Sequence, residues 1–533
     1  WEDAAPTDRY EMRSICLALI DSDILDDERL AIDVRGKRLE AVVVPFHLRS
    51  EAPPYARPIL ASHEEPPQSV ATNPVAARVR RLLERAAENT EWRQEACINL
   101  IPSEMTASML VRLLSIMDPA FRYAEHRPLE AFYEEEVFYY QGTGFIGQVE
   151  QQVERELATF LGCREVEARV ISGQMANGAV FSGLVDYRNR TDRRREPGRI
   201  ARVMNHHIGK GGHLSAQPMG ALRDFVARDP STERPAVLNF PVLPENPYRV
   251  DVPATLELID TYRPELIVLG KSVIIHREPV EPIRRFLDEQ AIPAVLMYDM
   301  AHVLGLVGPH FQRPFDEGAD LVTGSTHKTF FGTQRGVIGT RFEEDEERYE
   351  LWEAIRSRTF PGSVSNHHLG TLVGLLMATY EMQRFKDEYQ PAVIANAKAF
   401  ARALADCGLS VAGDPSIDFT ETHQVVVDVG YGRGPSIAAR LEANNIICNY
   451  QARPQDEGFT AAGALRLGVA EMTRFGMEPD DFRELASLMR DVIVADADVA
   501  ERVRELRKRF REMRYCFGTE DFPDLTRRLS GLV

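Results

Sequence analysis

The feature that most constrains this chain is a series of short apolar runs that alternate with helical stretches from Asn99 to about residue 360. Each run is too short for a helix and is bounded by polar residues or glycine. This pattern is typical of a mostly parallel sheet wrapped by helices, so we expect an α/β fold. The candidate strands are Ala168–Ile171, Arg202–Met204, Leu266–Leu269, Ala294–Tyr298 and Leu321–Thr323.

The regions on either side of this central part have a different character. Residues 1–50 predict a small β-rich appendage, with a helix from Tyr10 to Ile24 and a hairpin that pairs Leu30–Val34 with Leu39–Val44 across a glycine turn. Residues 51–74 are rich in proline and predict a linker. After Pro74 an amphipathic helix is expected, which opens an N-terminal arm and large domain over residues 75–365.

Residues 366–533 predict a smaller C-terminal α+β domain. We expect two consecutive helices, Leu369–Phe385 and Pro391–Cys407, followed by the strands Gln424–Asp428 and Ile446–Cys448. The charged stretch from Glu501 to Arg514 predicts a last helix with a solvated face.

The composition describes a globular protein, with 44% hydrophobic and 27% charged residues in a chain of 533. A net charge of -18 argues against nucleic acid or an anionic membrane as a partner. Six cysteines without a Cys-x-x-Cys pair predict reduced thiols in a cytoplasmic protein and no metal site. Neither a transmembrane helix nor a signal peptide is expected.

The position of Lys328 gives the first indication of chemistry. It lies in Thr323–Thr329, directly after an apolar run, between a histidine and several hydroxyls. A buried lysine cation needs a partner, a solvent path or a covalent bond. Upstream, another apolar run ends at Asp299, and this order is typical of a pyridoxal-phosphate site, where the aspartate pairs with the pyridinium nitrogen and the lysine forms a Schiff base. Alone, the segment would predict a surface lysine beside a capping threonine; Asp299 favours the cofactor.

Ser172, Gly173 and Gln174 follow a predicted strand and open a predicted helix. Backbone amides at a helix start, with a glycine that permits close approach, bind phosphate without a lysine. An ordinary turn is the alternative interpretation. The position after a strand, in a chain with a predicted phosphate-bearing cofactor, favours a phosphate site.

The segment Asn205–His213 contains three histidines and three glycines. A zinc site would require a nearby carboxylate or cysteine at a suitable spacing. A Walker loop would require serine or threonine after Lys210, where this chain has glycine. We therefore interpret His213 as lying flat against the cofactor ring, with the glycines providing room.

Eight segments resemble serine hydroxymethyltransferases, which are fold-type-I pyridoxal-phosphate enzymes. They occur in the family's order over residues 95 to about 500: Leu100–Glu104, Tyr123–Glu125, Ser172–Asn177, Gly211–His213, Asp299–His302, Thr326–Thr329, Phe360–Gly362 and Leu465–Gly468. Within residues 1–50, a short stretch also resembles the end of the C-terminal barrel of aminomethyltransferases, the glycine-cleavage T-protein family.

The resemblance implies roles at the cofactor ring and at its phosphate. Lys328 would hold the Schiff base, Asp299 would keep the ring nitrogen protonated and His213 would stack on the ring. His302, with Ser272 close by, would support the ring-oxygen side. The residues implied to hold the phosphate are Ser172, Gly173, Gln174, His327 and, from a partner subunit, Gly362.

The resemblance also implies the substrate groups. Arg466, with Ser103 nearby, would bind the substrate carboxylate. Glu125 would be the acid/base that moves the hydroxyl proton during Cα–Cβ cleavage. The site would be completed by Tyr123, Tyr139 and Tyr140, some of them from the neighbouring subunit, which implies a homodimer or a dimer of dimers with shared active sites.

The chain departs from the family where the family binds tetrahydrofolate. A longer acidic segment, His126–Phe138, replaces a short link, and Asn449–Pro454 replaces the folate loop. Gln174 stands where the family usually has serine. These changes leave the use of tetrahydrofolate open, whereas pyridoxal 5'-phosphate is expected.

The implied function is an enzyme of amino-acid and one-carbon metabolism that interconverts serine and glycine. It would make or break the Cα–Cβ bond of a β-hydroxy-α-amino acid through a glycine quinonoid. The altered loops favour an alternative, a folate-independent threonine aldolase or transaldolase of specialised metabolism. A non-catalytic scaffold is a third hypothesis. Its partners would be an amino acid and an aldehyde or folate.

Overall fold

The computed structural model describes residues 29–34, 37–42, 74–129, 135–192 and 196–533. The chain divides into two compact units, Trp1–Ala86 and Ala87–Val533. In the first unit, β1 (Arg29–Val34) pairs antiparallel with β2 (Lys37–Val42), which confirms the predicted hairpin. The predicted helix Tyr10–Ile24 and residues 51–73 of the predicted linker lie outside the described residues. Helix α1 (Pro74–Glu91) begins with a proline at a position where helices tolerate it.

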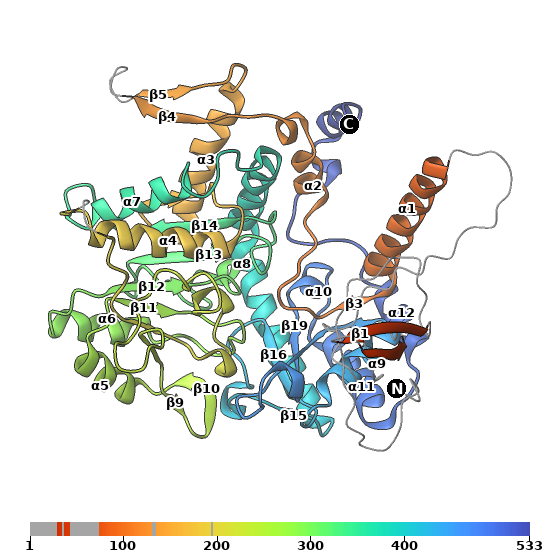
Figure 1. Cartoon of the computed structure of the whole chain (residues 1–533). Coiled ribbons are helices and arrows are strands. Elements are labelled where there is room, and N and C mark those ends of the chain that lie inside the picture. Colours follow the sequence, from red (N-terminus) through yellow and green to blue (C-terminus); the bar gives the residue numbers. More distant parts are fainter. Residues whose placement is uncertain (1–28, 35–36, 43–73, 130–134, 193–195) are drawn as a thin grey trace. The chain divides into compact units, whose positions relative to one another are not determined.

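Within the described residues, the second unit contains a central sheet of seven strands in the order β6-β14-β13-β12-β11-β7-β8 (Figure 1). Only β14 runs antiparallel to its neighbours. The mostly parallel sheet predicted from the apolar runs is therefore confirmed. The bounds are β6 Glu165–Glu167, β7 Val203–Asn205, β8 Val237–Asn239, β11 Leu266–Leu269, β12 Val295–Asp299, β13 Leu321–Ser325 and β14 Gly336–Thr340.

Both faces of this sheet are buried, because alternate residues of each strand enter different cores. Leu266 and Val268 of β11 belong to one core, while Ile267 and Leu269 belong to the other. The first core is closed by α4 (Gly173–Arg188) and α7 (Tyr349–Thr359). The second is closed by α3 (Gly144–Leu161), α5 (Val252–Tyr262), α6 (Val280–Glu289) and α8 (Leu369–Asp406).

The predicted strand Ala168–Ile171 is wrong, since β6 ends at Glu167. The backbone of this segment bonds to other groups: Ala168 O accepts from Arg335 Nη2 at 2.8 Å, and Val170 O accepts from Gly336 N at 3.0 Å. The side chain of Arg335 and the first amide of β14 thus bond to this segment, which makes no regular strand ladder. The segment still leads into α4, as predicted.

The C-terminal part contains a four-stranded sheet in the order β15-β16-β19-β18, counted over the described residues. Its strands are β15 Ser410–Val411, β16 Gln424–Asp428, β18 Asn449–Gln451 and β19 Ala464–Gly468. The predicted strand Ile446–Cys448 is shorter than expected: β17 (Ile446–Ile447) leaves this sheet and pairs with β3 (Ile98–Asn99). Helices α9 (Gly434–Ala443) and α11 (Pro479–Ala495) pack here.

Two predicted helices are one continuous helix, α8, with Pro391 inside it. Proline has no amide hydrogen to donate to the carbonyl of Asp387, the residue four positions earlier, but Asp387 is exposed. Tyr389 and Gln390, just before the proline, are buried and fixed by hydrogen bonds to Thr329 O and Gly305 O. Packing on both sides of the proline therefore outweighs its local cost.

The last charged helix is also shorter than predicted. Helix α12 spans Ala500–Lys508, and Arg507 on it is buried, so the predicted solvated face is wrong at this position. Its guanidinium donates to Cys97 O at 3.0 Å and lies over the Phe475 ring. The remaining elements are α2 Met109–Ser115, α10 Ala470–Arg474, α13 Pro523–Ser530, β4 His126–Leu129, β5 Glu135–Phe138, β9 Val242–Leu243 and β10 Asn246–Val250.

None of the helices in the described ranges combines the length and the hydropathy that a membrane span requires. The division of the chain into the two units falls between Ala86 and Ala87. The domain boundaries predicted at residues 50, 74 and 365 stay predictions.

Candidate active site

Asp299 and Lys328 follow adjacent parallel strands and reach the same edge of the central sheet. Asp299 ends β12, where it pairs in register with Thr323 of β13, and Lys328 lies in the turn after β13. Lys328 Nζ donates to Ser325 Oγ at 3.4 Å. Burial lowers the pKa of Lys328 to about 8; the Asp299 carboxylate opposes this shift and the Arg466 guanidinium adds to it. The amine is therefore easily deprotonated, as a nucleophile requires.

Asp299 is almost fully buried and is held by several donors. Asn177 Nδ2 donates to its Oδ2 at 2.7 Å, the Ala301 amide donates to Oδ1 at 3.1 Å, and His213 Nδ1 contacts Oδ2. Burial alone would raise the pKa of Asp299, but the His213 ring and these hydrogen bonds leave it below its usual value. The carboxylate is thus ionised and suited to pair with a cationic ring nitrogen.

His213 and His302 meet at the same place. Their rings are 5.6 Å apart and nearly perpendicular. Burial, reinforced by the charges of Lys328 and Arg466, lowers the pKa of His302 well below its usual value, so its ring is neutral. The backbone itself requires the glycines before His213, since Gly211 has a φ of +89° and a side chain at Gly212 would collide with His206 O. They shape the backbone turn that carries His213.

The start of α4 lies against the end of β13. Ser172 caps the helix by accepting from Met175 N at 3.1 Å, and a Cβ at Gly173 would lie 2.4 Å from Ser325 Oγ. Ser172, Gln174 and Gly362 line a cavity of about 810 Å³. Gly362 lines this cavity together with residues of its own chain, and its role across a subunit boundary stays a prediction. The start of α4 lies so close to the end of β13 that a side chain at Gly173 would meet the hydroxyl of Ser325.

Arg466 joins the small sheet to the lysine site. It lies on β19, is buried, and donates to Ser272 O at 2.8 Å and to Asn449 Oδ1 at 3.3 Å. Burial lowers the pKa of Arg466 to about 10. Among the described residues no carboxylate forms an ion pair with it, so the guanidinium is free to bind an anionic group. Ser103 follows Pro102, which packs on Gly468 of β19, the strand that carries Arg466.

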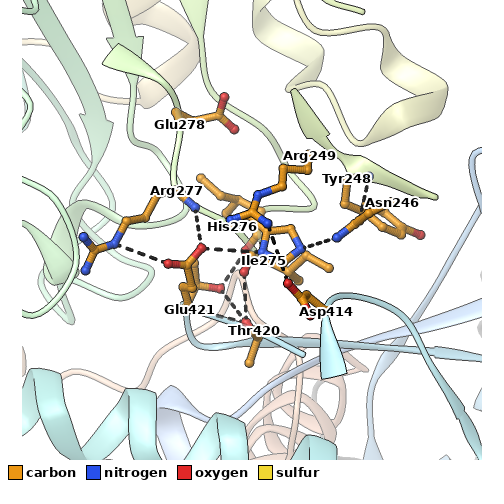
Figure 2. Close-up of polar contacts among 12 residues, drawn as sticks. Asn246, Tyr248, Arg249, Ile275, His276, Arg277, Glu278, Asp414, Thr420 and Glu421 are labelled. Carbon is orange, nitrogen blue, oxygen red and sulfur yellow. Dashed lines mark hydrogen bonds and ion pairs between the residues drawn. The ribbon is translucent and has the colours of Figure 1, made fainter. Parts of the chain in front are cut away.

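Polar contacts join the segment Ile275–Arg277 to Thr420 and Glu421, which precede β16 of the small sheet (Figure 2). His276 and Arg277 point toward Glu421, whose carboxylate lies 3.5 Å from each. Gln424 bridges the two parts, donating to Ser272 O and accepting from Ile274 N, both at 3.1 Å. The position of Ser272, and with it that of Arg466, is therefore set by both parts of the molecule.

The residues predicted to complete the site, Tyr123, Glu125 and Tyr140, form a second group with contacts of its own. Tyr123 and Tyr140 are half exposed, and their rings are 5.4 Å apart. Glu125 O accepts from Tyr139 N at 3.0 Å. Within the described part of the chain, none of Tyr123, Glu125 and Tyr140 makes a hydrogen bond to Lys328, which donates to Ser325. The acidic segment after Glu125 forms the hairpin β4–β5, in which His126 pairs with Phe138.

Several important partners escaped the sequence analysis. Asn177, which holds Asp299, lies one helical turn after Gly173 in a recognised motif, and that spacing was a usable signal. Ser325 lies within Thr323–Thr329, but its contact with Lys328 was not predicted. Gln424 and Asn449 had no signal, because their partners lie 152 and 17 residues away.

The residues at the sheet edge fit pyridoxal phosphate. His302 and His327 each keep a buried Nδ1 without a partner, which a ligand can satisfy. The amine of Lys328, the carboxylate of Asp299, the helix start at Ser172 and the unpaired cation of Arg466 match an aldehyde, a ring nitrogen, a phosphate and a substrate carboxylate. The mostly parallel sheet with this edge defines a fold-type-I pyridoxal-phosphate enzyme.

The comparison with known families is specific. The serine hydroxymethyltransferase family model matches residues 79–489, so the chain belongs to this family. A serine hydroxymethyltransferase from Korarchaeum cryptofilum is 37% identical over 440 residues, which cover 81% of this chain and 95% of the relative. One from Archaeoglobus fulgidus is 38% identical, covering 80% of this chain and 91% of the relative.

A solved structure gives a second point of reference. The L-threonine transaldolase from Pseudomonas fluorescens superposes with a TM-score of 0.72 at 26% identity, over 86% of this chain and 98% of that chain. The fold expected from the sequence is therefore confirmed. The resemblance of residues 1–50 to aminomethyltransferases stays a prediction.

Proposed function

We propose that this protein makes or breaks the Cα–Cβ bond of a β-hydroxy-α-amino acid, with the interconversion of serine and glycine as its reaction. The observation that carries the proposal is the buried, unpaired guanidinium of Arg466 beside Lys328, since an amino-acid substrate brings the missing carboxylate. The serine hydroxymethyltransferases at 37% and 38% identity support the same reaction.

When bound, pyridoxal phosphate supplies an electron-poor ring that stabilises negative charge at Cα. Lys328 would hold the cofactor covalently and Asp299 would keep the proton on its ring nitrogen. Arg466 would orient the substrate by binding its carboxylate in a fork geometry. Glu125 would move the proton of the β-hydroxyl, which lets the aldehyde leave.

We further propose that two copies share each site. Tyr123, Glu125 and Tyr140 have the chemistry that the reaction needs, yet the two tyrosines contact each other and Glu125 O accepts from the neighbouring Tyr139 N. A second copy that brings these side chains to Lys328 would complete the site. The proposal includes a homodimer in the cytoplasm, where the five cysteines of the described residues, all free, would stay reduced.

One observation favours a second candidate, a folate-independent threonine transaldolase. Arg453, in the segment that replaces the folate loop, is bound to Asp428 at 2.8 Å and to Asp456 at 2.7 Å. Both carboxylates occupy its guanidinium, which leaves little positive charge there for an acidic folate. The likeness to a known transaldolase supports this candidate as well.

The test is to purify the full chain with pyridoxal phosphate and to assay serine cleavage with and without tetrahydrofolate. Serine cleavage that requires tetrahydrofolate supports the hydroxymethyltransferase. Exchange between threonine and an added aldehyde without folate supports the transaldolase. Absence of both activities in a protein that carries the cofactor absorbance band would contradict the proposal.

A further inference from the structure

A buried carboxylate on α3 holds two histidines from distant parts of the chain. Glu150 Oε2 accepts from His126 Nε2 at 2.9 Å, and its Oε1 accepts from His367 Nε2 at 2.7 Å. The side chains of Glu150 and His367 are only 9% and 2% exposed. Because His126 directly follows Glu125 and opens β4, Glu150 anchors the segment that carries the proposed acid/base.

From His367, hydrogen bonds lead on to the turn that holds Lys328. His367 Nδ1 accepts from Arg335 Nη2 at 3.1 Å, and Arg335 O accepts from Thr326 N at 3.0 Å. Thr326 lies two residues before Lys328. A continuous hydrogen-bonded path thus runs through Glu150, from the turn that holds Lys328 to the residue beside Glu125.

Phe360 packs against both histidines. The Phe360 ring stacks on His126 at 6.3 Å, meets His367 edge-on at 6.4 Å, and carries the Arg169 guanidinium at 4.8 Å. Phe360 leads directly into Gly362, which lines the cavity at the start of α4. Movement of His126 would therefore also disturb the segment that borders this cavity.

Glu150 must be a carboxylate to do this. Both neighbouring nitrogens donate, so the residue between them has to accept twice. Burial alone would raise the pKa of Glu150, but the hydrogen bonds from His126 and His367 bring it down to about 2, so it is charged at neutral pH. An amide at this position would accept from one histidine and turn a donor toward the other.

We propose that Glu150 is a positioning residue that fixes Glu125, through His126, to the body of its own chain, so that Glu125 is held in place for the shared site that it completes. The hairpin that starts at His126 is where the sequence departs from the family, so Glu150 on α3 holds the first residue of the segment that distinguishes this chain. The inference rests on the proposed role of Glu125 in Cα–Cβ cleavage.

The test compares Glu150→Gln with the wild type in the full chain loaded with pyridoxal phosphate. We expect kcat for cleavage of the β-hydroxy amino acid to fall about tenfold to a hundredfold, the scale of a misplaced catalytic group. The substrate KM and the cofactor absorbance band should stay within about twofold, the scale of an uncoupled change. Exchange of the Cα proton of glycine in heavy water, which breaks no Cα–Cβ bond, should be unaffected.

Glu154→Gln is the matched control, because Glu154 lies on α3 one turn after Glu150, the carboxylate that accepts from both histidines. Burial and the nearby Glu167 raise the pKa of Glu154 to about 7, so an amide resembles its protonated form. It should leave kcat unchanged. In a Glu125→Gln background, Glu150→Gln should cause no further loss, since its effect passes through Glu125.

If Glu150→Gln fails to fold, His126 provides the second variant from the other side of the contact. His126→Phe should reproduce the loss of kcat, while His126→Gln, whose amide can still donate to Glu150, should retain most of it. An unchanged kcat in Glu150→Gln, or an equal loss in the Glu125→Gln background, would overturn the inference. Loss of the absorbance band or of all cleavage in the wild type would instead contradict the proposed function.

Discussion

The two groups of predicted site residues are built in different ways. Lys328 and Asp299 are placed by the register of neighbouring buried strands, and Arg466 is fixed between two sheets. Tyr123 and Tyr140 are half exposed and lie on a segment without central-sheet neighbours. The cofactor half of the site is therefore fixed by packing within one chain, whereas we propose that the half that carries Glu125 depends on Glu150 and on a second copy.

The largest effect should come from the rigid half. Lys328→Ala removes the group that captures the cofactor, and activity should fall by about four orders of magnitude or more, the scale seen when a covalent catalyst is removed. The absorbance band of the bound cofactor should disappear, as measured by a spectrum of the purified protein. A melting temperature close to that of the wild type would show that the fold survives; a retained band would refute the role of Lys328.

Glu125→Gln tests the other half. Loss of the acid/base should lower kcat by about 10²- to 10⁴-fold, while the cofactor spectrum stays normal. The comparison becomes sharper when this variant is mixed with Lys328→Ala under conditions that exchange subunits. If two copies share each site, the mixture of two inactive proteins should regain activity. Mixtures that exchange subunits and stay inactive would mean that each chain completes its own site.

Arg466→Lys should act on binding more than on chemistry. Lysine keeps the charge but loses the planar fork, and a hydrogen bond to a charged group is worth about 1.5–3 kcal/mol, so the KM for the amino acid should rise roughly 10- to 150-fold. Steady-state kinetics check this outcome. Arg453→Lys, at a guanidinium already bound by two carboxylates, is the control and should leave the amino-acid KM unchanged.

The smallest effect concerns pH. Because burial lowers the pKa of Lys328 to about 8, the amine is protonated below this pH and free above it. The rate at which the cofactor-free protein captures pyridoxal phosphate should rise about tenfold per unit up to pH 8 and then level off. Stopped-flow absorbance measures this rate. A rate that continues to climb toward pH 10 would mean that Lys328 is not shifted.

Local sequence patterns predicted a helix or strand correctly where the residues of that element determine its structure. The runs Leu266–Leu269 and Leu321–Thr323 are buried strands because every residue in them is apolar or small, and Ser172 caps a helix because its hydroxyl can accept from the amide three residues on. The same reasoning failed at Ala168–Ile171, where the Arg335 side chain bonds to Ala168 O and no strand forms, and at Pro391, where tertiary packing keeps α8 continuous.

The sequence alone determined the class of chemistry. Asp299 and Lys328 each follow an apolar strand, and parallel strands carry such residues to one edge, so the pyridoxal-phosphate site was predictable. Only the tertiary structure decided that Arg466 reaches Ser272, 194 residues away, and that Glu150 holds His367, 217 residues away. No local pattern encodes such pairs, because each partner satisfies its own helix or strand equally well in many folds, and only the packed chain brings them within hydrogen-bonding distance.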